Sequence, residues 1–344
     1  MFPYSLHVNS DNFPPKTVGL AFVGFRHGHI FDLYERAQAH PRIRITAVCE
    51  EDIPSSLLST RPLPVDFDDF DRMMAESDCE AVAIGDCYGR RGSLVVRALR
   101  AGKHAIVDKP LCTRLDEFEE ISDLERATGL RVGLMLDLRD SGNALGLREV
   151  VRSGRIGPIQ TMSFAGQHPL IRSTRPAWYF EPGMHGGTLN DIAIHALDLI
   201  PWLSGLQVAE ITASRTWNAK AADVPDFRDC GQFILRLSNG GGVIGDVSYL
   251  APDRCGYKTD NYWKIILHGT QGFAETSWNA PGILVADDSD PNPALIPPAP
   301  PRPGGYLEDF LADVAGSSGP DALKTQDVLA VSRLALELQQ RSKE

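Results

Sequence analysis

Short apolar runs alternate with amphipathic stretches over the first 140 or so positions of the chain. Runs such as VGLAFVG (18–24) are typical of strands buried on both faces, and the stretches between them carry apolar residues at helical spacing. Strict alternation of this kind predicts βαβ units, and therefore a doubly wound parallel sheet of the Rossmann type. The predicted strands are 18–24, 44–50, 80–86, 104–110 and 131–139, and the predicted helices are 29–40, 66–77, 93–102 and 115–129.

The pattern changes after residue 137. A predicted helix at 143–157 is followed by two strand pairs, at 231–250 and 262–278, which turn at glycine-containing tetrapeptides. Residues 291–303 contain seven prolines, which predicts an extended surface loop. A final amphipathic helix is predicted at 327–342. This half is therefore expected to be an α+β domain with a large, mainly antiparallel open sheet.

A chain of 344 residues is long enough for two cores, so two domains are expected. We predict an N-terminal arm at 1–16, a dinucleotide-binding domain at 17–137, and a substrate and oligomerisation domain at 138–344. The terminal helix 327–342 is a candidate to pack back on the first domain.

Composition narrows the class of partner. The net charge of −11 argues against nucleic acid, which requires a clustered positive surface. No apolar stretch approaches membrane-spanning length, and the first residues do not resemble a secretory signal, so we expect a cytoplasmic protein with no membrane partner. The six cysteines are scattered without zinc-finger spacing and are expected to be free thiols.

The turn after the first predicted strand is a candidate dinucleotide site. A Gly-x-Gly-x-x-Gly turn lets the backbone approach a pyrophosphate at a helix N-terminus. Here the turn reads Gly24-Phe25-Arg26-His27-Gly28-His29, with Arg26 at the second glycine position and His29 at the third. Taken alone, a structural turn is the better interpretation of this motif. Its place between a buried strand and a helix favours cofactor binding.

Two strand ends carry further candidates. Glu50 ends the second strand, where an acid can bind both adenosine ribose hydroxyls and repel a 2′-phosphate, which favours NAD over NADP; Glu51 competes for this role. Asp108 and Lys109 end the fourth strand, where ligands of open parallel sheets gather. Lys109 is a candidate to stabilise negative charge on a substrate oxygen, against the alternative of an ordinary surface lysine.

The segment after Gly186-Gly187 has helical spacing that places Asp191, His195 and Asp198 on one face. A histidine suits removal of a hydroxyl proton as hydride leaves the same carbon, and an aspartate one turn away can orient it. A helix N-terminal acid with a satisfied core histidine is the alternative. A metal site is a third interpretation, but no further ligand follows from the spacing, so no metal is predicted.

These segments together resemble the Gfo/Idh/MocA oxidoreductases, which include glucose–fructose oxidoreductase and inositol dehydrogenase. The resemblance rests on VGLAFVG (18–24), AGKHAIVDKPL (101–111), GRIGPIQ (154–160) and the Gly-Gly…Asp…His…Asp helix within 186–205. It implies a Rossmann domain followed by an α/β domain whose open sheet mediates homo-oligomer contact, in a dimer or tetramer.

The resemblance also implies roles for individual residues. The catalytic lysine, aspartate and histidine of the family match Lys109, Asp191 and His195. The substrate pocket includes these three with Trp178, Tyr179 and His185. The cofactor-binding residues are Gly24, Phe25, Arg26, His27, Glu50, Asp86, Asp108 and Lys109. Two segments depart from the family pattern: the glycine turn, and Asp86–Arg91 after the third strand, where a Thr-Pro is usual.

The resulting prediction is an NAD(P)-dependent oxidoreductase, with NAD favoured, that moves a hydride to or from a secondary alcohol of a sugar, polyol or sugar derivative. Oxidation of one sugar carbon acidifies its neighbour, so an NAD-recycling lyase, epimerase or glycosidase is an alternative. The altered glycine turn motivates a second alternative, a non-catalytic sugar or dinucleotide sensor on the same fold.

Overall fold

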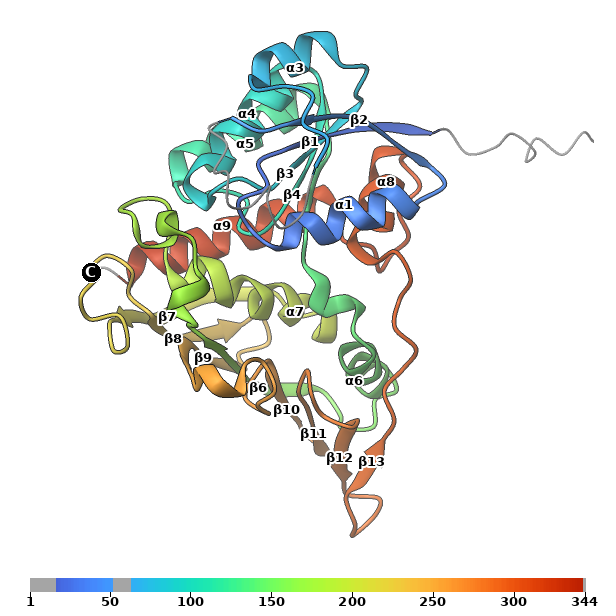
Figure 1. Ribbon diagram of the computed structural model, residues 1–344. Coiled ribbons are helices and arrows are strands. Elements are labelled where there is room, and N and C mark those ends of the chain that lie inside the picture. Colours follow the sequence, from blue (N-terminus) through green and yellow to red (C-terminus); the bar gives the residue numbers. More distant parts are fainter. Residues whose placement is uncertain (1–16, 52–62, 343–344) are drawn as a thin grey trace, which may run out of the picture.

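The computed structural model describes residues 17–51 and 63–342. The predicted arm at 1–16 therefore lies outside the described residues. Two sheets dominate the architecture, one above the other in Figure 1, and helices pack against both. No helix in the described ranges combines the length and apolarity needed to cross a membrane.

The first sheet is parallel throughout and has the strand order β2-β1-β3-β4-β5. This confirms the predicted doubly wound fold. Its strands are the buried apolar runs of the sequence: β1 (Val18–Val23), β2 (Ile43–Cys49), β3 (Ala81–Ile84), β4 (His104–Val107) and β5 (Val132–Leu134). The accompanying helices are α1 (His29–Ala39), α3 (Phe70–Glu76), α4 (Tyr88–Arg100) and α5 (Leu115–Thr128).

The second sheet has eight strands in the order β13-β12-β11-β10-β6-β9-β8-β7. Only β6 and β9 pair in parallel among these strands, so the prediction of a mainly antiparallel sheet is confirmed. The strands are β6 (Ile159–Pro169), β7 (Val208–Trp217), β8 (Cys230–Leu237), β9 (Gly242–Ala251), β10 (Lys264–Gly269), β11 (Gly272–Thr276), β12 (Ile283–Asp287) and β13 (Ala294–Ile296).

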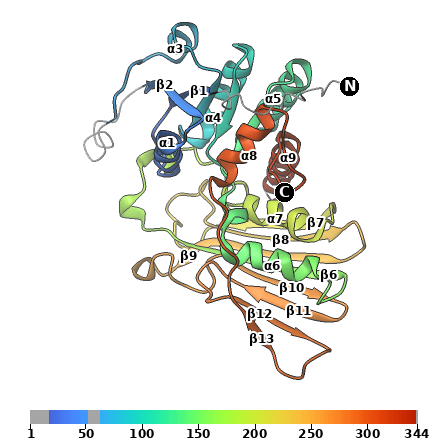
Figure 2. The ribbon, with the colours of Figure 1, turned by 90° about the vertical axis from the view of Figure 1, so that its right-hand side faces the viewer.

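Helices fill the space between the two sheets. Helices α6 (Gly142–Arg152) and α7 (Ile194–Ser204) lie along one face of the second sheet (Figure 2). Helix α8 (Gly305–Val314) contacts β5, and α9 (Thr325–Arg341) contacts both β5 and α5 on one side and α7 and β7 on the other. The C-terminal helix thus joins the layers around both sheets.

Three local predictions were wrong. Helix α4 begins at Tyr88 rather than at residue 93, because the buried side chains of Tyr88 and Arg91 anchor its first turn. The predicted strand 131–139 ends at Leu134 and continues into a 3₁₀ turn, η1 (Asp137–Asp140). The proline-rich segment is not entirely loop, because β13 pairs with β12 at the sheet edge, where proline is tolerated.

The outer face of the second sheet carries exposed aliphatic side chains. Ile234 on β8 is 47% exposed, and Ile244 and Leu250 on β9 are 61% and 46% exposed. Exposed apolar groups gathered on one face are typical of surfaces that bind another protein.

A buried ion pair ties η1 to α7. Arg139 and Asp198 are both at least 94% buried, and Arg139 Nε lies 2.7 Å from Asp198 Oδ2. Burial of such a pair is tolerated only while both charges are present, because either one alone would stay desolvated.

We therefore expect Asp198→Ala to lower the free energy of unfolding by about 3–5 kcal/mol, because Arg139 would be left buried and unpaired. Chemical denaturation measures this loss. Glu76→Ala, which removes an exposed partner of Arg72, should change stability by no more than about 1 kcal/mol. Equal effects of the two substitutions would contradict the assignment.

Candidate active site

The turn between β1 and α1 is tightly packed at its start. Gly24 has a φ of +73°, and a Cβ built there would lie 2.6 Å from the Cβ of Asp86. A side chain at position 24 is therefore excluded by both conformation and space. Nothing lies within 4 Å of a Cβ built on Gly28, so the far end of the turn is open.

Arg26 lies across the carboxyl ends of β2 and β3. Its Nη2 is 3.2 Å from Glu50 Oε1, and its Nε is 3.0 Å from Asp86 Oδ1. The other Glu50 oxygen accepts the backbone N–H of Phe25 at 2.6 Å. The predicted cofactor residues Arg26, Glu50 and Asp86 thus form one buried cluster. The side chain of Phe25 instead packs in the core against Phe22, Phe31 and Tyr34, so its backbone alone faces this cluster.

The two histidines of the turn meet the end of β4. His27 Nδ1 lies 2.5 Å from Asp108 Oδ2, and His29 Nδ1 lies 3.2 Å from Asp108 Oδ1. Tyr88 completes the group, with its hydroxyl 3.1 Å from His27 Nε2. Burial lowers the pKa of His27 to about 4, despite the opposing effect of Asp108, so this imidazole is neutral at pH 7.

Arg91 is a fully buried guanidinium that holds the same strand ends. Its Nε donates to the carbonyl of Asp86 at 2.8 Å, and its Nη1 donates to the carbonyl of Asp108 at 2.8 Å and also to that of Lys109. Its Nη2 donates to Asp108 Oδ2 at 2.7 Å. Burial opposes ionisation of Asp108, but Arg91 and His27 hold the pKa of this carboxyl well below its usual value.

Lys109 forms the contact between β4 and the second half of the chain. Its Nζ lies 2.6 Å from Asp191 Oδ1 and donates to the Asp191 carbonyl at 3.1 Å. Both side chains are more than 90% buried. Burial opposes ionisation of Asp191, but Lys109 and His185 hold the pKa of its carboxyl well below the usual range, so this carboxylate is ionised at neutral pH.

Asp191 stands on a π-helical turn, η4 (Leu189–Ala193), that runs directly into α7. Gln339 of α9 supports the start of this turn, because its Oε1 accepts the N–H groups of Leu189 at 2.9 Å and Asn190 at 3.3 Å. Gly187 has a φ of +98°, and a Cβ there would lie 2.2 Å from the Gln339 amide. The glycine therefore allows α9 to approach the turn that carries Asp191.

Two of the predicted site residues, Tyr179 and His185, surround the second oxygen of Asp191 together with a tyrosine that the sequence did not indicate. Tyr249 on β9 donates a short hydrogen bond to Asp191 Oδ2, and the Tyr179 hydroxyl and His185 Nε2 each lie 3.4 Å from it. Trp178 packs edge-on against Tyr88 and tilted against Tyr179. The site is therefore an aromatic enclosure around one ion pair.

His195 lies on α7 beside this ion pair. Burial lowers the pKa of His195 well below 6.5, and the charge of Lys109 adds to the effect, so the imidazole is neutral. Its ring packs edge-on against Trp263 at 5.0 Å between centroids. The buried Nδ1 of His195 has no hydrogen-bond partner within residues 17–51 and 63–342.

The predicted pairing of Asp191 with His195 is not found among the described contacts. Asp191 is directed at Lys109 and the tyrosines, and Asp198 is paired with Arg139. The wide turn of η4 changes the angle between Asp191 and His195 relative to an α-helix, which the spacing alone does not reveal. Asp191 therefore positions Lys109 in this structure, and it makes no hydrogen bond to His195 among the described contacts.

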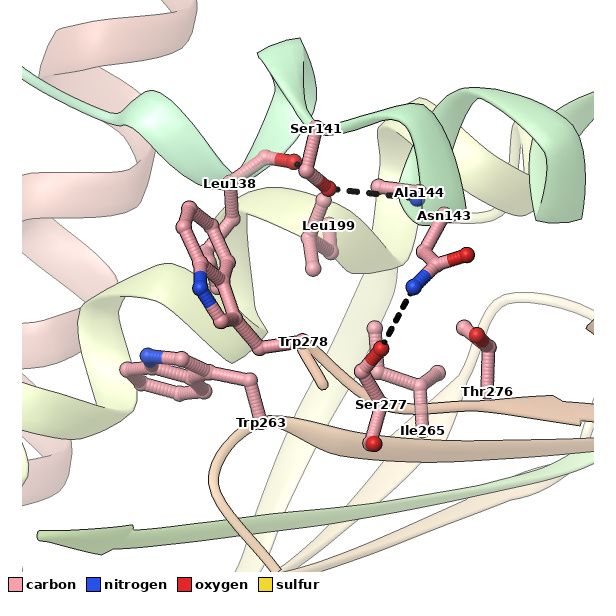
Figure 3. Close-up of a pocket in the computed structure, with 10 residues that line it drawn as sticks. All are labelled: Leu138, Ser141, Asn143, Ala144, Leu199, Trp263, Ile265, Thr276, Ser277 and Trp278. Carbon is pink, nitrogen blue, oxygen red and sulfur yellow. Dashed lines mark hydrogen bonds between the residues drawn. The ribbon is translucent and has the colours of Figure 1, made fainter. Parts of the chain in front are cut away.

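A small, partly open pocket is lined by Trp263 (Figure 3). Trp263 and Trp278 line it on one side, with Leu138 and Leu199 above and Ser277 below. Asn143 donates to the Ser277 carbonyl at 2.9 Å at its edge. Its volume is about 10 Å³, roughly that of one water molecule, so this cavity is too small for a sugar.

The first domain offers groups that fit a dinucleotide in part. Glu50 stands at the end of β2 with its buried Oε1 accepting no hydrogen bond from the part of the chain that the structure describes. Such an oxygen suits a ribose hydroxyl. The neighbouring Arg26 supplies positive charge at the turn. Its guanidinium also pairs with Glu50, so this acid repels a 2′-phosphate less strongly than an unpaired acid would.

The structure combines a Rossmann sheet with a lysine at a strand end that is paired with an aspartate near a histidine. This combination is typical of the NAD-binding oxidoreductases. The comparison with known families agrees. Residues 18–135 match the oxidoreductase family with an NAD-binding Rossmann fold, and residues 145–275 match the Gfo/Idh/MocA C-terminal domain. The chain belongs to the Gfo/Idh/MocA family, as its sequence motifs predicted.

Similar proteins act on sugars and polyols. The chain is 28% identical over 183 residues to inositol 2-dehydrogenase of Acidothermus cellulolyticus, covering 52% of this chain and 50% of that protein. It is 27% identical over 145 residues to 1,5-anhydro-D-fructose reductase of Ensifer adhaerens, covering 42% of this chain and 43% of that protein. The chain thus spans about half the length of these curated relatives or less.

A solved structure shares the whole fold. The WlbA dehydrogenase of Bordetella pertussis, in complex with NADH and UDP-GlcNAcA, superposes with a TM-score of 0.74 at 17% identity. The match covers 96% of this chain and 97% of that one.

The neutral, buried state of His27 predicts a pH-dependent stability. Between pH 6.5 and about 4 the unfolded chain binds a proton at His27 that the folded chain does not, so the free energy of unfolding falls as pH is lowered through this window. Denaturation is measured at several pH values, with EDTA present so that no metal ion binds the histidine. His27→Asn should reduce the slope of the free energy of unfolding against pH by up to about 1.4 kcal/mol per pH unit. His268→Gln, at an exposed position, should leave the slope unchanged. An unaltered slope in the His27 variant would refute the assignment.

Proposed function

We propose that this protein is an NAD-dependent oxidoreductase that transfers a hydride to or from a secondary alcohol of a sugar, polyol or sugar derivative. The observation that carries the proposal is the buried Lys109–Asp191 ion pair, which stands at the end of β4 beside the neutral His195. A charged donor and a neutral imidazole are the two groups that alcohol oxidation requires.

Lys109 binds the reacting oxygen and stabilises the negative charge that develops on it. His195 takes the hydroxyl proton in oxidation and returns it in reduction, for which it must be neutral beforehand. Asp191 fixes the position of Lys109 and is itself held by Tyr249. Trp178, Tyr179 and His185 form the substrate-binding wall. Hydride acceptance is the chemistry that the bound nicotinamide supplies.

The proposed cofactor site extends from Gly24 along the turn to Glu50 and Asp86, and ends at Asp108 and Lys109. Glu50 binds the adenosine ribose through Oε1, which is paired with Arg26 but accepts no hydrogen bond within the described ranges. The names of the relatives support the substrate class, since they include an inositol dehydrogenase and an anhydrofructose reductase.

We further propose a homo-oligomer, a dimer or tetramer, that acts in the cytoplasm on a small-molecule substrate without nucleic acid or membrane. The exposed aliphatic side chains Ile234, Ile244 and Leu250 support an interface on the open sheet. The proposed domains are 17–137 for the dinucleotide and 138–344 for substrate and assembly, with α9 contacting elements of both.

The first test removes the two reacting groups. His195→Ala and Lys109→Met should each lower kcat for NAD-linked oxidation of inositols and aldoses by about 10²–10⁴-fold, because a positioned acid–base group contributes this much. Lys264→Met, on β10, is the matched control and should keep full activity. Circular dichroism checks that each variant is folded. Wild-type kinetics in both site variants would refute the proposal.

The second test concerns cofactor choice. Glu50→Ala should weaken NAD binding in calorimetry by about tenfold or more, because hydrogen bonds to a charged group are worth about 1.5–3 kcal/mol. The same substitution should also reduce the difference in binding affinity between NAD and NADP. Glu51→Ala tests the competing acid, whose carboxylate contacts the Phe70 N–H and Arg90 instead, and should leave NAD affinity nearly unchanged. Loss of NAD affinity in Glu51→Ala but not in Glu50→Ala would assign the ribose to Glu51.

A further inference from the structure

Three metal-ligating side chains converge at the turn after β1. His27 and His29 come from the turn and the start of α1, and Asp108 comes from the end of β4. One ligand atom from each residue lies within 4.8 Å of the other two. Two histidines and one carboxylate around a common point are the ligand set of many zinc and non-haem iron sites.

The dinucleotide fold does not account for this convergence. A pyrophosphate turn needs backbone N–H groups and small residues, yet this turn directs two imidazoles at one buried carboxylate. Both histidines use the same nitrogen, Nδ1, to contact opposite oxygens of Asp108. The two rings are 4.4 Å apart between centroids.

Residues around the three ligands hold them in place. The Tyr88 hydroxyl lies 3.1 Å from His27 Nε2, the nitrogen that does not face Asp108. Arg91 donates to Asp108 Oδ2 at 2.7 Å, which leaves Oδ1 facing His29. Metal-binding histidines and carboxylates are typically oriented by hydrogen bonds of this kind to their remaining polar atoms.

The cluster is also open on one side. The side chain of His29 is 51% exposed, whereas Asp108 is fully buried, so solvent reaches the group at His29. No atom lies within 4 Å of a Cβ built on the adjoining Gly28, so the space beside it is open. Three protein ligands with one accessible side leave coordination positions for water or another ligand.

We propose that His27, His29 and Asp108 bind one divalent transition-metal ion, with Zn²⁺ or Fe²⁺ as the type of ion that this ligand set favours. Magnesium and calcium are disfavoured, because they prefer all-oxygen ligands. The proposed metal site shares this turn and Asp108 with the proposed cofactor site, so metal binding is measured on the full chain without NAD or substrate. A failure to bind metal would leave the proposed hydride transfer unaffected.

The test is calorimetric titration of the metal-free protein with Zn²⁺. The wild-type chain should bind one ion, and His29→Ala should weaken binding by at least about tenfold. His29 is chosen because its side chain is exposed, so its removal should leave the fold intact. Circular dichroism verifies the fold. His268→Ala removes an exposed histidine on β10 and should bind as the wild type does.

Cobalt substitution provides a second measurement. Co²⁺ bound to nitrogen and oxygen ligands should show visible d–d absorption without the near-ultraviolet charge-transfer band of thiolate ligands. The visible absorption should be lost in His29→Ala and kept in His268→Ala. Absence of Zn²⁺ binding, a thiolate band, or equal affinity in the wild type and His29→Ala would each overturn the proposal. In that case the three residues form only an internal charge network.

Discussion

The site depends on a single buried guanidinium. Arg91 donates to the carbonyls of Asp86, Asp108 and Lys109, so one side chain fixes the carboxyl ends of β3 and β4 together. Without it, three backbone carbonyls would lose this donor in a buried region, and the Asp108 carboxylate would keep only its contacts with His27 and His29. The position of Lys109 follows from this constraint, and the position of Asp191 follows in turn from Lys109.

The charges around Arg91 are arranged so that each acid faces a basic side chain. Glu50 and Asp86 face Arg26, Asp108 faces Arg91 and the turn histidines, and Asp191 faces Lys109. His195 is left neutral beside these pairs because it is buried next to a cation and has no carboxylate contact of its own among the described residues. A neutral imidazole next to a charged lysine is the division of roles that proton transfer to and from an alcohol requires.

The sequence predicted the architecture well and the side-chain pairing poorly. Apolar runs located all five strands of the first sheet, because each run is buried on both faces. Lys109 was found by its place at a strand end and the Gly-Gly segment by its helical spacing, and the two do lie together. The Arg139–Asp198 pair was not predicted because the two residues are 59 positions apart, and the π turn before α7 leaves no mark in the apolar spacing. Tyr249 lies within an ordinary strand pattern, so only the three-dimensional structure reveals its contact with Asp191.

The contact between Gln339 and the η4 turn has a consequence for how the protein is made. The backbone N–H groups that precede Asp191 are satisfied by a side chain from α9, which the ribosome adds almost 150 residues later. During synthesis both sheets can form before this helix has emerged, since their strands all precede it in the chain. The nascent protein can therefore acquire its layered shape first, and the geometry around Asp191 is completed only as a late docking event.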